Sequence, residues 1–286
     1  MLSFLFAFFT YIGWGIGDIF GTIASRKVGA YSTSLWILII GIFLFSLYIP
    51  FAFHELTRLT IPIFIINILL GFFYISGNVA LNEALVRSNP SMVLTINGSF
   101  TALVVILSLV FLGEHISGIQ GLVIAIIFLG IFLCTFDFGV LKKKQKLDTG
   151  ILFALYAMIS FAVYFTFIKS IVREIGWFWP NFISFLWFPM IYVYMKMKHI
   201  RVVYPLTKKT IFPIAASAFL LRSADFAFNI GISSGLTSIV APIAGAYPTL
   251  SAIIAYKVFK DPITRQQILG IIITLCGIVL LSLLSV

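Results

Sequence analysis

Long apolar runs separated by short polar segments follow one another along the whole chain. A run of about 20 apolar residues is long enough to cross a bilayer as a helix. A helix also satisfies its own backbone hydrogen bonds where lipid offers no partner. The pattern therefore predicts an all-α integral membrane protein with ten transmembrane helices. The predicted spans lie near residues 3–24, 32–53, 61–82, 90–112, 117–137, 150–171, 178–197, 211–231, 237–258 and 265–285.

The ten predicted spans form two copies of five, because the chain matches itself at an offset of 147 residues without a gap. An odd number of spans in each copy means that the second copy enters the membrane in the opposite orientation. Inverted repeats of this kind are typical of secondary transporters, which bind substrate between the repeats near the middle of the membrane. The matched residues include Asn82 and Asn229, Ser91 and Ser238, Gln120 and Gln267, and Gly130 and Gly277.

This repeat divides the chain into three predicted segments. The first five-helix repeat covers residues 1–140, the second covers residues 149–286, and the polar tract at 141–148 joins them. The tract holds four lysines, so we expect it to be a basic linker on the cytoplasmic side of the membrane.

The composition agrees with a membrane protein, since 61% of the residues are hydrophobic and 10% are charged. A soluble domain has about 25% charged residues. The net charge is +10, but the basic residues cluster in short loops beside predicted spans, so this charge does not indicate a nucleic-acid partner. Both cysteines, Cys134 and Cys276, lie within predicted spans and are interpreted as buried packing residues.

The distribution of Lys and Arg predicts the orientation in the membrane. Of the 19 basic residues, 15 lie in the loops after the first, third, fifth, seventh and ninth spans, and Arg58 and Arg173 lie on the opposite side. Cytoplasmic loops carry the excess of basic residues. We therefore predict a multi-pass protein of the cell membrane with both termini extracytoplasmic.

Two matched motifs end the fourth and ninth spans. They read FLGEHIS at 111–117 and VFKDPIT at 258–264, and each is followed by a matched glutamine, Gln120 or Gln267. With these motifs and two inverted five-helix copies, the chain resembles the drug/metabolite transporter superfamily and, within it, the EamA-type permeases. The resemblance implies transport and does not indicate the substrate.

One departure from the family pattern concerns the fourth span. The expected proline is present in the ninth span, as Pro242 and Pro248, but the fourth span has Asn97, Gly98 and Ser99 instead. Because proline kinks a helix, the fourth span is expected to be straighter and to have a different role in the site.

Polar and aromatic side chains inside the spans are the candidate substrate-binding residues, because a charge in the bilayer is costly unless it faces protein or a water-filled cavity. Asp18 has no charged neighbour three or four residues away, and its repeat partner is Phe165, so it is the proton-coupling candidate. Arg222 and Asp225 are three residues apart and can pair on one helix. The pair is interpreted either as a structural ion pair or as a contact for the substrate. The asparagines fit cavity lining and packing equally well. The candidate set is Tyr11, Trp14, Asp18, Tyr74, Asn78, Asn97, Arg222, Asp225, Asn229 and Tyr247.

Other polar residues near the span ends are expected to have structural roles. Glu114 and Asp261 are expected to cap the helix that follows each of them. Lys169 lies late in the sixth span and is expected to extend its ammonium group toward the surface. The first, third, fourth, sixth, eighth and ninth spans are predicted to line a central cavity. The fifth and tenth spans have few polar residues and are predicted to lie outside it.

These features favour a secondary transporter, acting as an exporter of a small organic metabolite by alternating access, with proton coupling through Asp18 as one option. A lipid-carrier flippase of the same fold is an alternative. A membrane enzyme acting on lipid-linked substrates is disfavoured, because the three histidines lie far apart in loops and the carboxylates form no closely spaced pair. No catalytic residue, metal site or cofactor is predicted. The expected partners are a small-molecule substrate and the lipid bilayer, without nucleic acid, and the protein is expected to be a monomer or a homodimer.

Overall fold

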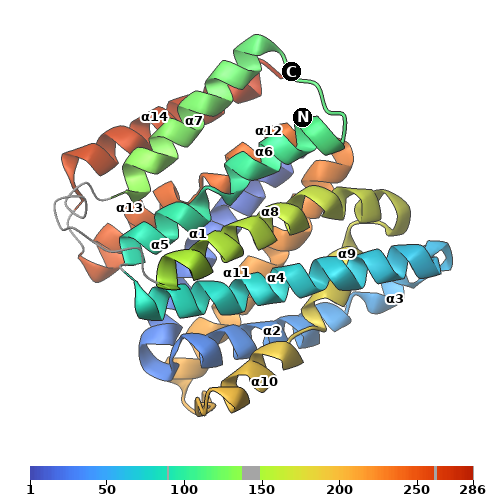
Figure 1. Cartoon of the computed structure of the whole chain (residues 1–286), viewed down its shortest axis with the longest axis vertical. Coiled ribbons are helices and arrows are strands. Elements are labelled where there is room, and N and C mark those ends of the chain that lie inside the picture. Colours follow the sequence, from blue (N-terminus) through green and yellow to red (C-terminus); the bar gives the residue numbers. More distant parts are fainter. Residues whose placement is uncertain (89, 137–148, 261–262, 286) are drawn as a thin grey trace.

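The computed structural model describes residues 1–88, 90–136, 149–260 and 263–285, and the regular structure in these ranges is helical (Figure 1). The predicted linker at 141–148 lies outside the described residues. The helices are α1 (Leu2–Val28), α2 (Ala30–Ser46), α3 (Ile49–Ala52), η1 (Phe53–Arg58), α4 (Ile61–Arg87), α5 (Pro90–Gly98), α6 (Phe100–Phe111), α7 (Gly118–Thr135), α8 (Thr149–Ile175), α9 (Phe178–Phe185), α10 (Pro189–Met197), α11 (Lys208–Ser234), α12 (Thr237–Gly245), α13 (Tyr247–Phe259) and α14 (Arg265–Leu283).

Eight helical segments of the described chain are long and apolar enough to cross a membrane. A ninth span results if α2 and the segment Ile49–Arg58, which bend by 63° relative to each other, count as one. The predicted span at 178–197 consists of two shorter helices, α9 and α10. Pro189 lies in the first turn of α10, where a proline is tolerated although it cannot continue a preceding helix. The tenth span therefore stays a prediction.

The fourth and ninth spans are both interrupted, at positions that match under the repeat. α5 gives way to α6 at Ser99, and α12 gives way to α13 at Ala246, 147 residues later. The second interruption precedes Pro248. The first follows Gly98, a poor helix former, and the Ser99 hydroxyl donates to the carbonyl oxygen of Thr95 at 3.0 Å, a contact that bends helices. Both spans are thus interrupted at matching positions, and the prediction of a straighter fourth span is not confirmed.

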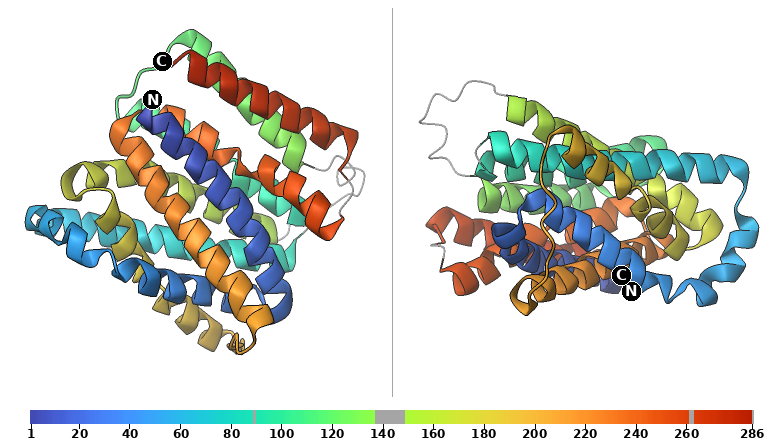
Figure 2. Two further views of the ribbon diagram at one scale, coloured as in Figure 1. Left: turned by 180° about the vertical axis from the view of Figure 1, so that it is seen from behind. Right: turned by 90° about the horizontal axis from the view of Figure 1, so that it is seen from below.

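The packing of the helices also follows the repeat. α1 packs along α11 and α4 packs along α8 (Figure 2), and exchanging the two repeats converts the first pair into the second. α7 and α14 pack on each other at one edge of the bundle (Figure 1) and exchange with each other. A two-fold relation between the repeats produces this set of pairs. The N- and C-termini lie near each other (Figures 1 and 2).

Small residues bring α1 and α11 into close contact. A Cβ atom added at Gly13 would lie 2.7 Å from the Cβ atom of Ala224, and one added at Gly17 would lie 2.7 Å from Leu221 Cδ2. The Ser217 hydroxyl donates to the carbonyl oxygen of Gly17 at 2.9 Å. Small residues let helix backbones approach closely in a membrane, so these two helices form a tightly packed wall of the bundle.

The outer faces of α7 and α14 are apolar and exposed, as at Ile119, Leu122 and Ile272. In a membrane protein such a face contacts lipid. Cys276 lies exposed on α14, whereas Cys134 is buried. The expectation that both cysteines are buried is therefore wrong for Cys276.

Candidate functional site

A cavity lies near the mid-length of the long helices. Its inner part has a volume of about 130 Å³ and is continuous with a wider part of about 600 Å³. A cavity of this size suits a small molecule. The residues that line both parts are Asp18, Asn78, Leu81, Asn97, Leu221, Arg222 and Tyr247.

The inner part is lined by α1, α4, α5, α6, α8, α11 and α13, which belong to the six spans predicted to form it. α7 and α14 contribute no described residue to this inner part. They do reach the wider part, through Cys134, Thr135 and Gln267. The prediction that these two spans lie outside the cavity is therefore wrong at its wide end.

The wider part extends to one end of the helix bundle. Its lining includes Arg26 near the end of α1, Leu94 in α5 and Phe259 at the end of α13. Arg26 and Leu94 are exposed. The cavity therefore opens at the end of the molecule where the predicted basic loops follow α1, α4 and α13.

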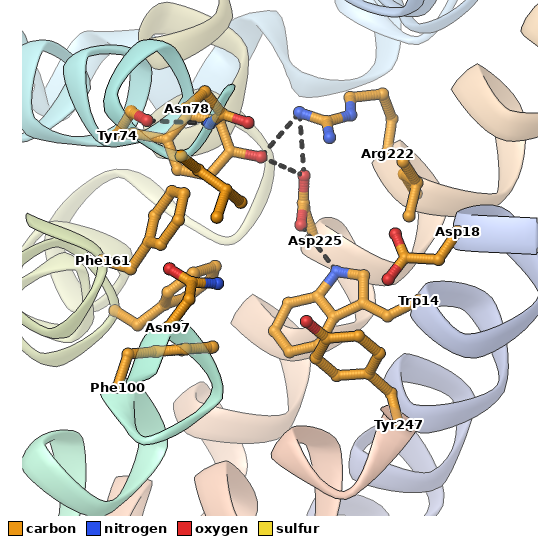
Figure 3. A pocket seen from close by; sticks show the side chains of 13 residues that line it. Trp14, Asp18, Tyr74, Asn78, Asn97, Phe100, Phe161, Arg222, Asp225 and Tyr247 are labelled. Carbon is orange, nitrogen blue, oxygen red and sulfur yellow. Dashed lines mark hydrogen bonds and ion pairs between the residues drawn. The ribbon is translucent and has the colours of Figure 1, made fainter. Parts of the chain in front are cut away.

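Asp225 is the centre of a hydrogen-bonded cluster that connects three helices (Figure 3). Its Oδ1 accepts a hydrogen bond from Trp14 Nε1 at 2.9 Å. Its Oδ2 accepts one from the Tyr74 hydroxyl at 3.0 Å and lies 3.1 Å from Arg222 Nη1. Arg222 Nη1 also donates to Tyr74 Oη at 2.7 Å. The Arg222–Asp225 ion pair is thus present, and it ties α11 to α1 and α4.

The Arg222 side chain is enclosed by its neighbours. Its guanidinium carbon lies 4.7 Å from the ring centre of Phe185 and 5.7 Å from that of Tyr74. A Cβ atom added at Gly41 would lie 2.6 Å from Arg222 Cγ, so α2 packs closely on the stem. The Nε atom is buried without a partner in the described structure. Arg222 also lines both parts of the cavity.

Asp18 differs from Asp225 because none of the hydrogen bonds or ion pairs between described residues involves its carboxylate. The carboxylate lies in the inner part of the cavity beside Trp14 and Tyr247 (Figure 3). An ionised carboxylate away from bulk water is costly unless it is paired. Asp18 is therefore free to take a proton or a cationic group.

Aromatic rings form much of the remaining inner wall. The Trp14 ring centre lies 5.3 Å from that of Phe165 and 5.6 Å from that of Tyr247, both edge to face. Phe100 lies 5.9 Å from Phe161 on the opposite side of the cavity (Figure 3). Ring faces accept apolar groups and attract cations.

The three candidate asparagines differ in their surroundings. Asn78 lines both parts of the cavity, and its amide group donates to the carbonyl oxygen of Tyr74 at 2.8 Å. Asn97 also lines both parts, and its side-chain oxygen is buried without a partner in the described structure. Asn229 lies outside the lining and donates to the carbonyl oxygen of Trp177 at 2.9 Å.

Tyr11 also lies outside the cavity lining, and its hydroxyl contacts Thr249 Oγ1 at 3.1 Å. For Tyr11 and Asn229 the structure thus shows interhelical packing contacts. The other eight candidates line the inner part, and their role in substrate binding stays a prediction. These eight are Trp14, Asp18, Tyr74, Asn78, Asn97, Arg222, Asp225 and Tyr247.

A second buried ion pair lies at the opposite end of the bundle. Glu114 Oε1 lies 2.6 Å from Lys169 Nζ. The two oxygens of Glu114 also accept hydrogen bonds from the backbone N–H groups of Thr237 and Ser238, each at 2.8 Å. Lys169 donates to the carbonyl oxygen of Gly235 at 2.8 Å. This cluster connects the α6–α7 loop, α8 and the first turn of α12.

The electrostatics of Glu114 follow from these contacts. Burial raises the pKa of its carboxyl group, but the Lys169 ammonium and the N–H groups of Ser238 and Thr237 outweigh burial. The pKa of Glu114 is therefore held below its ordinary value, and the group is a carboxylate at neutral pH.

Both expectations for this ion pair from the sequence are wrong. Glu114 caps α12 in the other repeat, while Ser117 and Gln120 form the capping box that starts α7. Lys169 is buried and does not extend to the surface. The sequence did contain a signal, because Lys169 has no acidic residue within one helical turn. A buried lysine then needs an acid from another segment at the same depth, and Glu114 meets that condition. Asp261, the repeat partner of Glu114, lies outside the described residues.

Comparisons with known proteins agree with this architecture. The model of the EamA-like transporter family matches residues 1–136 and 148–283, two segments that start 147 residues apart. A search of curated proteins finds no match. A solved structure described as "Crystal structure of protein" has a TM-score of 0.78 and 16% sequence identity, covering 99% of this chain and 97% of that chain. The likeness to this structure concerns the fold alone.

Proposed function

Because the chain belongs to the EamA-like transporter family, a family of multi-pass membrane transporters of the drug/metabolite type, we propose that it is a secondary transporter of a small organic metabolite. We propose that it works by alternating access. The cavity carries this proposal, because it opens at one end of the bundle and ends at mid-length near Asp18 and Asp225. A central site that is reached from one side at a time is what alternating access requires.

We assign the open end of the cavity to the cytoplasm. Of the 15 basic residues in the predicted cytoplasmic loops, the 11 that the structure describes lie at this end, and cytoplasmic loops carry the basic excess. The described conformation is then inward-facing, in the cell membrane, with both termini extracytoplasmic. The Glu114–Lys169 ion pair lies at the closed, extracytoplasmic end.

We propose that the direction of transport is export, with the cytoplasmic solute loaded in this inward-facing conformation. Asp18 is the candidate for coupling. A carboxylate without a protein partner holds either a proton or a polar group of the substrate, and the two compete for it. Substrate would then leave the cell as one proton enters, with Asp18 protonated on the outside and deprotonated on the inside.

Cysteine labelling tests the orientation and the one-sided access. In a background carrying Cys134→Ala and Cys276→Ser, a single cysteine is placed at Thr22, which lines the wide part of the cavity, or at Ser233, which is exposed at the end of α11. A membrane-impermeant maleimide should label Thr22→Cys only from the cytoplasm and Ser233→Cys only from outside. Labelling of Thr22→Cys only from outside and of Ser233→Cys only from the cytoplasm contradicts the orientation. Equal labelling of Thr22→Cys from both sides contradicts alternating access.

A further inference from the structure

The charges of the inner cavity point to a class of substrate, an inference that rests on the transport function proposed above. Three charged side chains line the inner part: Asp18, Arg222 and Asp225. Arg222 and Asp225 neutralise each other, and both oxygens of Asp225 are engaged by protein donors. When Asp18 is ionised, the inner cavity therefore carries a single uncompensated negative charge.

An anionic or zwitterionic substrate would need a cation that the protein does not already neutralise, and Arg222 is paired with Asp225 at 3.1 Å. Its guanidinium group is bonded to Asp225 and Tyr74, lies against the ring of Phe185, and has a buried Nε atom. Arg26 lines only the wide part and is exposed, so water and salt screen its charge. Charge selection therefore takes place at Asp18, where screening is weaker.

The rings around Asp18 favour a cation with an apolar body. Trp14 and Tyr247 lie on one side of the carboxylate, and Phe100 and Phe161 lie across the cavity from it (Figure 3). Aromatic faces attract ammonium groups and also bury apolar surface. The inner part, at about 130 Å³, has room for a head group, and the wide part, at about 600 Å³, has room for the body attached to it.

We propose that the substrate is an organic monocation, a protonated or quaternary amine carried on an aromatic or other apolar body. The ammonium group lies against Asp18 and beside the rings of Trp14 and Tyr247. The body extends past the phenylalanines toward the wide part of the cavity. Asp18 thus supplies the charge recognition, and the rings supply recognition of the body.

Calorimetric binding to the purified full chain in detergent micelles tests this class. Four probes share one phenyl group and differ in charge: phenethylamine, phenyltrimethylammonium, phenylalanine and hydrocinnamate. We expect the two cations to bind at least about tenfold more tightly than the zwitterion and the anion, as a charge-assisted contact implies. Phenylalanine or hydrocinnamate binding as tightly as the cations overturns the proposal, and so does the absence of binding by both cations.

Two variants with the same change in charge locate the recognition. Asp18→Asn should weaken binding of both cations at least about tenfold. Glu174→Gln removes a negative charge from an exposed position of α8 and should leave their affinities unchanged. Equal effects of the two variants overturn the assignment to Asp18. The probe series needs no variant, so it remains decisive if Asp18→Asn does not fold.

Binding in micelles also separates this inference from the transport function. If the protein binds the cations but does not move them across proteoliposome membranes, the inference about the substrate class holds and the transport proposal is contradicted. If the protein moves phenylalanine and not phenethylamine, the transport proposal holds and the inference about the substrate class is contradicted.

Discussion

Replacing Glu114 by glutamine tests what holds the closed end of the bundle. The variant keeps the size of the side chain but removes the charge that Lys169 approaches at 2.6 Å. The first turn of α12 also loses the carboxylate that accepts from Thr237 and Ser238 at 2.8 Å. Lys169 becomes a buried ammonium group that has lost its charged partner, although the glutamine oxygen and the carbonyl oxygen of Gly235 can still accept hydrogen bonds from it.

The expected loss is large because both side chains of the pair are buried. Removing one member of a buried ion pair costs about 3–5 kcal/mol. Lys169→Met leaves Glu114 with its two backbone donors, so its cost should be smaller, about 1–3 kcal/mol. The variant that combines both changes should lose at least about 1 kcal/mol less than the two single losses added together.

The effect of Glu114 also has a defined dependence on pH. Its pKa is lower in the folded protein than its ordinary value, so its stabilisation is complete above the ordinary carboxyl pKa of about 4.3. The stabilisation is lost as the pH falls through the lower pKa of the folded protein. The difference in stability between the wild type and Glu114→Gln should therefore shrink as the pH falls into this acid range.

Reversible unfolding in detergent micelles measures these free energies. Glu174→Gln, at an exposed position, is the control and should change the free energy of unfolding by no more than about 0.5 kcal/mol. If Glu114→Gln changes it no more than this control, or if the two single losses add in the double variant, the ion pair does not stabilise the closed end.

Three further outcomes are expected. Arg222→Leu alone should reduce folding yield more than Arg222→Leu combined with Asp225→Leu, because the single change leaves a buried charge without its partner; equal yields would show that the two residues are not coupled. Gly13→Ala places a Cβ atom 2.7 Å from that of Ala224 and should lower the free energy of unfolding by about 1–3 kcal/mol through overpacking, and an unchanged melting temperature would contradict the close contact. Asp18→Asn in proteoliposomes should no longer accumulate substrate after a pH step; accumulation equal to that of the wild type would show that Asp18 is not the coupling group.

The sequence alone could predict most of the spans and most of the lining of the inner part of the cavity, because the physical requirements behind both are local. A span needs about 20 apolar residues, and a polar side chain within it must face the bundle interior. Asp18, Tyr74 and Asp225 follow from these two requirements. The hydrogen-bond partners do not, because Asp225 meets Trp14 and Tyr74 across 211 and 151 residues of chain. Such contacts depend on which helices pack together.

Glu114 and Lys169 show where local reasoning fails. A carboxylate just before a helix is a common cap for that helix, and a lysine near a span end commonly reaches the surface. In the fold, Lys169 lies beside the start of α12, and its ammonium group binds Glu114 together with the N–H groups of Thr237 and Ser238. The interruption at Ser99 is similar, because Gly98 and a serine hydroxyl produce it without a proline.

The ion pair at the closed end has no counterpart in the first repeat at the position of Lys169. The residue 147 positions earlier is Thr22, an uncharged residue that lines the wide end of the cavity. If the two repeats exchange conformations during transport, closing the cytoplasmic end cannot form the same contact there. Each 1.4 kcal/mol by which the two closed forms differ changes their ratio about tenfold. A single unmatched lysine would therefore bias the empty transporter toward the form that faces the cytoplasm, before any substrate or proton binds.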